Sequence, residues 1–194
     1  MQEIDISFKN NEGLNLSGRL WLPPGGKPEA FAIFAHCFTC NKNFHAVRNI
    51  SQALVLSRIA VLSFDFTGLG RSQGDFADTN FSTNVADLVS AAAYLEKTYD
   101  APQILVGHSL GGAAVLHAAR DIPSVKAIAV VGAPYNVAHV SKHLGKDIEK
   151  VRKEGEAEIN IGGRPFHIKQ QFLDDINSVS LEEDKSTSDI RKYL

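Results

Sequence analysis

The residues best suited to chemistry lie in the pentapeptide 107–111, whose sequence is Gly-His-Ser-Leu-Gly. An apolar run precedes it at 103–106, and a segment of small residues follows it at 112–119. This order predicts a strand, a sharp turn and a helix, which is the setting of a nucleophile elbow. The flanking glycines let strand and helix approach without a Cβ clash. The pattern predicts Ser109 as the nucleophile of an acyl transfer, the alternative being an ordinary glycine-rich turn.

Acyl transfer also needs hydrogen-bond donors that face the developing oxyanion. In an elbow, one donor is the main-chain N–H of the residue after the nucleophile, here Leu110. A second donor comes from the loop after an earlier strand, and the loop 36–39 follows the apolar run 31–35. We therefore predict the Phe38 N–H as the second donor. The alternative is that this loop only turns the chain.

The polar residues around these loops are predicted to be structural. His36 is expected to polarise its loop by hydrogen bonding, and His108 to pack against neighbouring loops. His117, on the helix after the serine, is expected to be an ordinary core or surface histidine. Asp65 ends a strand and precedes a glycine-rich loop, which it is expected to hold in place. It is not the expected acid, because the order in an elbow fold is serine, acid, histidine.

Cys37 and Cys40 form a Cys-x-x-Cys pair, for which a redox or metal role is possible. A zinc site would need more ligands, and the chain has no second cysteine pair. A thioredoxin-type interpretation would need the rest of the thioredoxin fold around this pair. We predict two free thiols near the pocket, with neither a metal nor a cofactor.

Composition excludes several classes of partner. The chain has 194 residues, 44% hydrophobic residues and a formal net charge of −2, typical of one globular domain. Without a Lys/Arg cluster, nucleic acid and anionic membranes are not expected partners. No apolar run approaches the ~20 residues of a membrane span, and no secretory signal is visible at the N-terminus. A cytoplasmic location is therefore expected.

The hydrophobic pattern of residues 1–135 alternates between strands and helices. Two alternating stretches, 4–8 and 14–22, predict an antiparallel hairpin. Continuous apolar runs predict buried strands at 31–35, 59–64, 103–106 and 125–131, and helices are expected at 43–57, 85–95 and after Ser109. The connections are too long for hairpins. This predicts an α/β fold, with a mainly parallel sheet, helices on both faces and an antiparallel N-terminal edge.

The pattern changes after residue 135. Residues 31–141 carry 14 charged side chains, whereas 142–194 carry 21 in half the length. A polar helix is expected at 136–153, a hairpin at 156–168 and a short helix at 170–176, followed by a polar tail. We predict a core at 1–135, and a lid-like insertion with its tail at 136–194. The alternative is a plain surface extension.

The chain resembles the α/β-hydrolase superfamily, in particular its serine aminopeptidase-like and esterase-like branch. It is similar above all to the hydrolase half of bacterial proteins that fuse an α/β hydrolase to an OsmC-like domain. The stretches that carry the resemblance are His-Cys-Phe-Thr-Cys at 36–40, Phe-Asp-Phe-Thr-Gly-Leu-Gly-Arg-Ser at 64–72, Asn-Val-Ala-Asp-Leu-Val at 84–89, Gly-His-Ser-Leu-Gly-Gly at 107–112 and Gly-Ala-Pro at 132–134. The resemblance implies Ser109 as nucleophile, Phe38 and Leu110 N–H as the oxyanion hole, and a lid over 136–190. Cys37 stands after His36 at a position where other branches of the superfamily commonly have a glycine.

The resemblance also implies two further strands after the lid, whose loops carry the acid and the histidine. The sequence ends at Leu194 before either strand, so a truncated sheet and an incomplete triad are expected. The acidic residues and histidines of 136–194 do not occupy the family's positions, and none is assigned a role: Asp147, Asp174, Asp175, Asp184, Asp189, His139, His143 and His167. Self-association through the exposed sheet edge is expected.

Two functions follow from these observations. The first is a serine hydrolase acting on a small ester or amide through a Ser109 acyl-enzyme, here lacking its acid and base. The second is a non-catalytic binding or assembly protein with the same architecture. The sequence does not name the substrate, because esterases, lipases, thioesterases and peptidases share the elbow.

Overall fold

The computed structural model describes residues 1–25, 27–145 and 147–186. Within these ranges, six strands form the main sheet in the order β1-β2-β4-β3-β5-β6. Their bounds are β1 Gln2–Lys9, β2 Asn15–Leu22, β3 Ala30–Ala35, β4 Ile59–Phe64, β5 Ile104–His108 and β6 Ala127–Val131. β3, β4, β5 and β6 are parallel, whereas β1 and β2 form an antiparallel hairpin that joins β4. The predicted α/β fold is confirmed.

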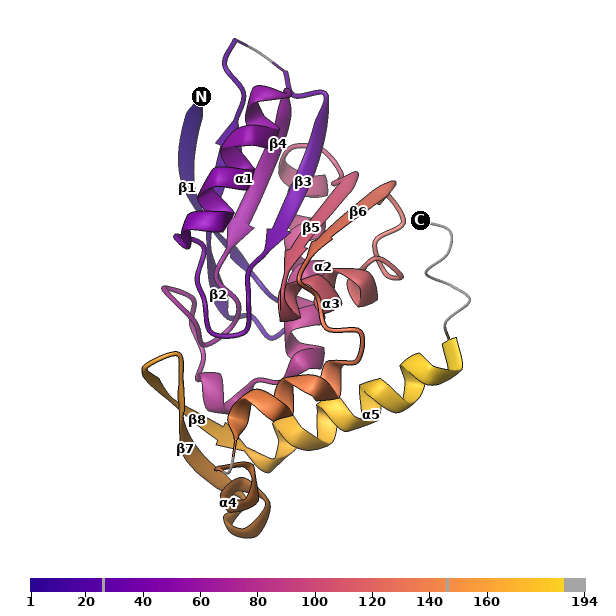
Figure 1. The fold of residues 1–194 in the computed structure, drawn as a ribbon. Helices are drawn as coiled ribbons and strands as arrows, with labels where there is room; N and C mark the ends of the chain where they lie inside the picture. Colours follow the sequence, from indigo (N-terminus) through magenta and orange to yellow (C-terminus); the bar gives the residue numbers. More distant parts are fainter. Residues whose placement is uncertain (26, 146, 187–194) are drawn as a thin grey trace.

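Helices cover both faces of this sheet (Figure 1). Alternate side chains of β3 show why: Phe31 and Ile33 belong to the core under α2 and α3, whereas Phe34 packs with the side chains of α1. These helices span His45–Leu56 (α1), Phe81–Thr98 (α2) and Leu110–Ala118 (α3). A strand covered on both sides must be apolar at every position, which is what the continuous runs indicated.

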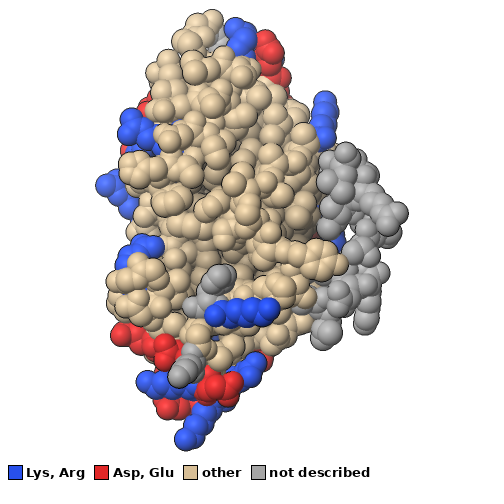
Figure 2. Space-filling model, in the orientation of Figure 1, with Lys and Arg blue, Asp and Glu red and all other residues tan. Residues whose placement is uncertain are grey.

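Residues 136–186 lie along one end of the sheet (Figure 1). They comprise the 3-10 helix η2 (Val137–Leu144), α4 (Asp147–Glu154), the hairpin β7 (Glu156–Ile161) and β8 (Arg164–Lys169), and α5 (Gln170–Ser186). Their apolar side chains join the same core as α2 and α3. In Figure 2, charged side chains gather at the end formed by α4 and this hairpin.

Two expectations for this region were inaccurate. The single helix expected at 136–153 is two helices, and the first of them ends at Gly145, whose positive φ of 61° is one that glycine adopts without a Cβ clash. The helix expected at 170–176 continues to Ser186, so part of the expected polar tail is helical. The rest of that tail, 187–194, lies outside the described residues. The hairpin expected at 156–168 is confirmed.

β6 is the edge of the main sheet among the described residues, where it pairs with β5 alone. It begins two residues later than expected, at Ala127. Its Val130 and Val131 side chains are 45% and 48% exposed, although they are apolar. The exposed edge expected from the sequence is therefore present in the described part of the chain. None of the helices in the described ranges is long and apolar enough to cross a membrane.

Candidate active site

Ser109 occupies a sharp turn between β5 and α3. Its backbone angles are φ 55° and ψ −126°, a positive φ that L side chains rarely adopt. The turn is held because the Ser109 N–H donates to the Val131 carbonyl at 2.9 Å, and the Gly112 N–H donates to the Ser109 carbonyl at 2.8 Å. A Cβ on Gly107 would lie 2.5 Å from the Gly111 carbonyl oxygen, so strand and helix approach too closely for any side chain there. This is the geometry that the pentapeptide predicted.

The loop after β3 lies beside this turn. In the parallel pairing of β3 with β5, Ala35 is opposite Gly107, so both strands end at the same edge. A Cβ on Gly111 would collide with the carbonyl oxygens of Ala35 and His36, which shows how closely α3 approaches this loop. Among the described residues, neither the Phe38 N–H nor the Leu110 N–H has a hydrogen-bond acceptor. Both N–H groups are therefore unpaired within these residues.

A buried ion pair between Lys42 and Asp65 joins the loop after β3 to the end of β4. Asp65, fully buried at the end of β4, accepts hydrogen bonds from the Lys42 N–H at 2.7 Å and from Lys42 Nζ at 2.5 Å. It also accepts from the Arg71 N–H at 3.0 Å, so it holds the glycine-rich loop as expected. The sequence analysis did not predict this ion pair. Lys42 lies 23 residues before Asp65, and nothing in the sequence indicates that its side chain is only 3% exposed.

His36 is buried and structural. Its Nδ1 lies 2.9 Å from the Cys37 carbonyl oxygen, and its ring packs edge-on against Phe66. Burial lowers the pKa of His36 to about 4, outweighing the opposing effects of the Cys37 carbonyl and Asp65. The imidazole is therefore neutral near pH 7 and donates through Nδ1–H.

Two partly buried histidines, His108 and His117, also pack against aromatic rings. The ring of His108 stacks on Phe44, with 6.0 Å between centroids, and His117 meets Phe81 edge-on at 5.2 Å. Within the described part of the chain, no side chain hydrogen bonds to the Ser109 hydroxyl. In these residues, therefore, no general base is hydrogen bonded to the serine.

Two of the acidic residues and histidines beyond residue 135 make contacts away from Ser109. The Asp175 carboxylate accepts from the Ser82 N–H at 2.9 Å and from its hydroxyl at 2.6 Å. His167 lies 3.1 Å from Glu156 across the β7–β8 hairpin. The side chains of His143 and Asp184, and the whole of Asp189, lie outside the described part.

The expectation of two free thiols was wrong, because Cys37 and Cys40 form a disulfide. The chain turns between them, with the Cys40 N–H donating to the Cys37 carbonyl at 3.0 Å and the Cα atoms 5.2 Å apart. That separation lies in the usual range for disulfides. No cluster of three or more His, Cys, Asp or Glu in the described ranges could hold a metal ion.

Residues 164–172 pack against the loop 36–40. The Phe38 ring stacks on Phe172 of α5 at 4.9 Å and contacts Phe76 at 5.5 Å, on the 3-10 helix η1 (Phe76–Asp78). The guanidinium of Arg164 donates to the Thr39 carbonyl. The segment after residue 135 is therefore in direct contact with the loop that carries Phe38.

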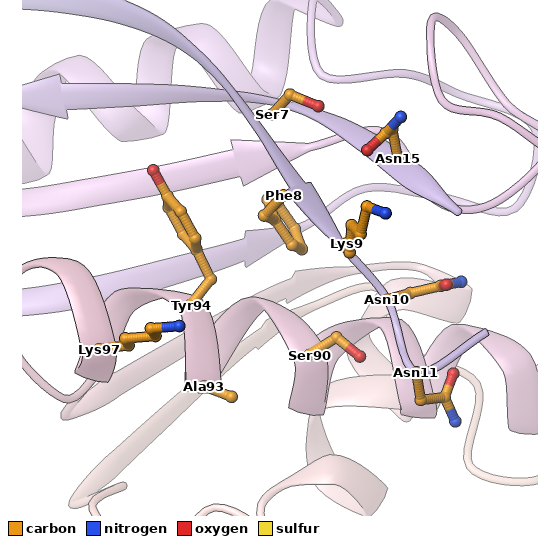
Figure 3. A pocket seen from close by; sticks show the side chains of 10 residues that line it. All are labelled: Ser7, Phe8, Lys9, Asn10, Asn11, Asn15, Ser90, Ala93, Tyr94 and Lys97. Atoms are coloured by element: carbon orange, nitrogen blue, oxygen red, sulfur yellow. The ribbon is translucent and has the colours of Figure 1, made fainter. Parts of the chain in front are cut away.

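A hollow of about 640 Å³ lies between the β1–β2 hairpin and α2 (Figure 3). In the sheet, β2, β4 and β3 separate β1 from β5 and its serine. No carboxylate or histidine lies among its lining residues, which are Ser7, Phe8, Lys9, Asn10, Asn11, Asn15, Ser90, Ala93, Tyr94 and Lys97.

Comparison with known proteins decides the family. The model of the alpha/beta hydrolase family matches residues 32–179, which include the loop 36–40, the elbow and the hairpin. The chain belongs to the alpha/beta hydrolase family. The esterase domain of a Rhodothermus marinus protein is 48% identical to this family member, with a TM-score of 0.70 over 94% of this chain and 71% of that one.

Curated relatives of this alpha/beta hydrolase chain match shorter stretches. The monoglyceride lipase of Rattus norvegicus is 33% identical over 119 residues, 59% of this chain and 38% of the relative. The mitochondrial palmitoyl-protein thioesterase ABHD10 of Mus musculus is 35% identical over 104 residues, 54% of this chain and 32% of the relative. The chain thus spans about a third of the length of the curated relatives that it matches.

Proposed function

We propose that the protein is a serine hydrolase that cleaves a small ester or amide. The Ser109 hydroxyl attacks the carbonyl carbon of the substrate, and the carbonyl oxygen becomes an oxyanion held by the Phe38 and Leu110 N–H groups. Collapse expels the alcohol or amine and leaves an acyl-enzyme, which water then cleaves. The observation that carries this proposal is the positive-φ turn at Ser109, next to two unpaired main-chain donors.

The relatives support an acyl substrate without naming one. Their names describe an esterase, a lipase and a thioesterase, all of which act on acyl groups. We propose that residues 136–186 act as a lid, since Phe172 and Arg164 contact the loop that carries Phe38 and thus border the substrate's carbonyl. The lid would select the acyl group.

The proposed mechanism also needs residues beyond those that the structure describes. A serine nucleophile needs a base and an acid, and no described side chain is hydrogen bonded to the Ser109 hydroxyl. We propose that both come from residues outside them, which agrees with the larger size of the relatives. The OsmC-like fusion partner and the cytoplasmic location stay predictions.

The test is covalent labelling of the full-length gene product with a fluorophosphonate. We expect one label on Ser109, located by peptide mass spectrometry, and its loss in Ser109→Ala. Ser90→Ala is the matched control, because the Ser90 hydroxyl only donates to the Ala86 carbonyl within α2. Labelling that survives in Ser109→Ala would contradict the proposal.

A second candidate function is binding without turnover. It is favoured by one observation, that no described side chain hydrogen bonds to the Ser109 hydroxyl. The same experiment separates the two, because a folded full-length protein that takes up no label would support the binding function.

A further inference from the structure

The Cys37–Cys40 disulfide encloses the residue that we assign as an oxyanion donor. Phe38 lies between the two cysteines. Two bonds close this short turn, the S–S bond and the hydrogen bond from the Cys40 N–H to the Cys37 carbonyl at 3.0 Å. The Phe38 N–H direction is therefore set by the geometry of a four-residue ring.

The surroundings of this turn leave the disulfide accessible. Cys37 and Cys40 are both partly exposed, whereas His36 before them and Lys42 after them are buried. The flanks are also anchored, by His36 Nδ1 on the Cys37 carbonyl and by Lys42 on Asp65. A change at the sulfurs would therefore act locally on the turn, and the anchored flanks would stay in place.

We propose that Cys37 and Cys40 form a thiol–disulfide exchange site, whose reducing partner is a dithiol, and that the oxidised form holds Phe38 N–H in position for catalysis. The catalytic part of this proposal rests on the proposed function. The exchange site itself does not. A disulfide in a short accessible turn is more typical of exchange than of structural cross-linking, which usually joins distant segments.

The exchange balances as a two-electron reduction. A thiolate of the dithiol attacks one sulfur of the pair, which breaks the Cys37–Cys40 bond and forms a mixed disulfide. The second thiol of the reductant then displaces the protein sulfur and closes a cyclic disulfide. The reductant loses two electrons and two protons, and the protein gains two thiols.

Reduction removes the covalent ring and leaves the turn held by the hydrogen bonds that the Cys37 carbonyl accepts from the Cys40 N–H and from His36 Nδ1. The Phe38 ring keeps its contacts with Phe172 and Phe76, so the side chain stays while the peptide between the cysteines gains freedom to rotate. An oxyanion donor acts only when it is already aimed at the developing charge. We therefore expect slower acylation of Ser109 in the reduced protein.

The first measurement is the redox titration of the full-length protein in mixtures of reduced and oxidised dithiothreitol. Thiols are trapped with iodoacetamide, and the peptide that contains residues 37–40 is followed by mass spectrometry. We expect both cysteines of this peptide to appear as thiols together in one transition. Cysteines that stay unpaired in every mixture, or that never react, would overturn the exchange site.

The second measurement is hydrogen exchange of the peptides that cover residues 36–44 in the two redox forms. Faster exchange in the reduced form is expected, and equal exchange would refute the effect on the turn. Cys37→Ser/Cys40→Ser should exchange like the reduced protein under all conditions. Cys40→Ser alone serves if the double variant does not fold.

The third measurement is the rate of fluorophosphonate labelling of Ser109 in each form. We expect labelling about 10-fold or more slower after reduction, as for a lost oxyanion donor, and no redox response in Cys37→Ser/Cys40→Ser. An unlabelled Ser109 in both forms refutes the proposed function, while the first two measurements still decide the exchange site. Equal labelling in both forms, with a loosened turn, would refute the coupling between the disulfide and Phe38.

Discussion

The buried imidazole of His36 should make the protein less stable in mild acid. The ring is only 1% exposed, its Nδ1–H donates to the Cys37 carbonyl, and its Nε2 has no hydrogen-bond partner among the described residues. Burial lowers its pKa from 6.5 to about 4 in the folded state. The unfolded chain keeps a histidine of ordinary pKa, so the two states bind protons differently between these values.

The direction and size of the effect follow from this difference. Above pH 6.5 the ring is neutral in both states, and its contribution to stability is fully present. As the pH falls from 6.5 to about 4, the unfolded state binds a proton that the folded state does not, so stability is lost. The total loss is about 3 kcal/mol, since each pH unit between the two pKa values is worth ~1.4 kcal/mol.

Urea denaturation of the oxidised protein at several pH values between 7.5 and 4 measures this loss. His36→Gln keeps an amide that can donate to the Cys37 carbonyl but does not titrate. The unfolding free energy of the wild type should fall by about 3 kcal/mol more than that of His36→Gln across this range. His45→Gln, at the exposed start of α1, is the matched control and should parallel the wild type. Parallel curves for the wild type and His36→Gln would refute the reasoning.

Three further predictions concern the elbow, the core and the sheet edge. Gly111→Ala should destabilise the fold by about 1–3 kcal/mol in urea, because its Cβ would meet main-chain carbonyls at the end of β3; an unchanged midpoint would contradict this close approach. Asp87→Ala should cost about 2–4 kcal/mol, since the buried Asp87 carboxylate accepts from Asn10 and from both donors of Thr67, and thermal melting checks this loss. The isolated 194-residue chain should self-associate through β6, and Val130→Lys should weaken this association in sedimentation velocity; a monomeric wild type would exclude it.

The local pattern determined the fold and the elbow. Strands that are buried on both faces must be apolar throughout, and the turn at Ser109 needs a glycine two residues before it and two residues after it. Both features can therefore be recognised from a short stretch of sequence. The exposed edge at β6 was implied by the family resemblance, and β6 is the edge of the main sheet among the described residues. The roles of Ser109, Phe38 and Leu110 stay predictions that this geometry supports.

Tertiary structure alone decided the contacts between distant residues. Lys42 and Asp65 are each common residue types, and only the packing of two loops brings them into one buried pair. The contact between Phe172 and Phe38 could not be predicted from the sequence, because the direction of α5 depends on the turn after the β7–β8 hairpin. The Cys37–Cys40 bond depends on the backbone conformation of four residues, which spacing does not specify. Sequence patterns report which surface of an element is buried, whereas pairing between elements is set by long-range packing that no single segment encodes.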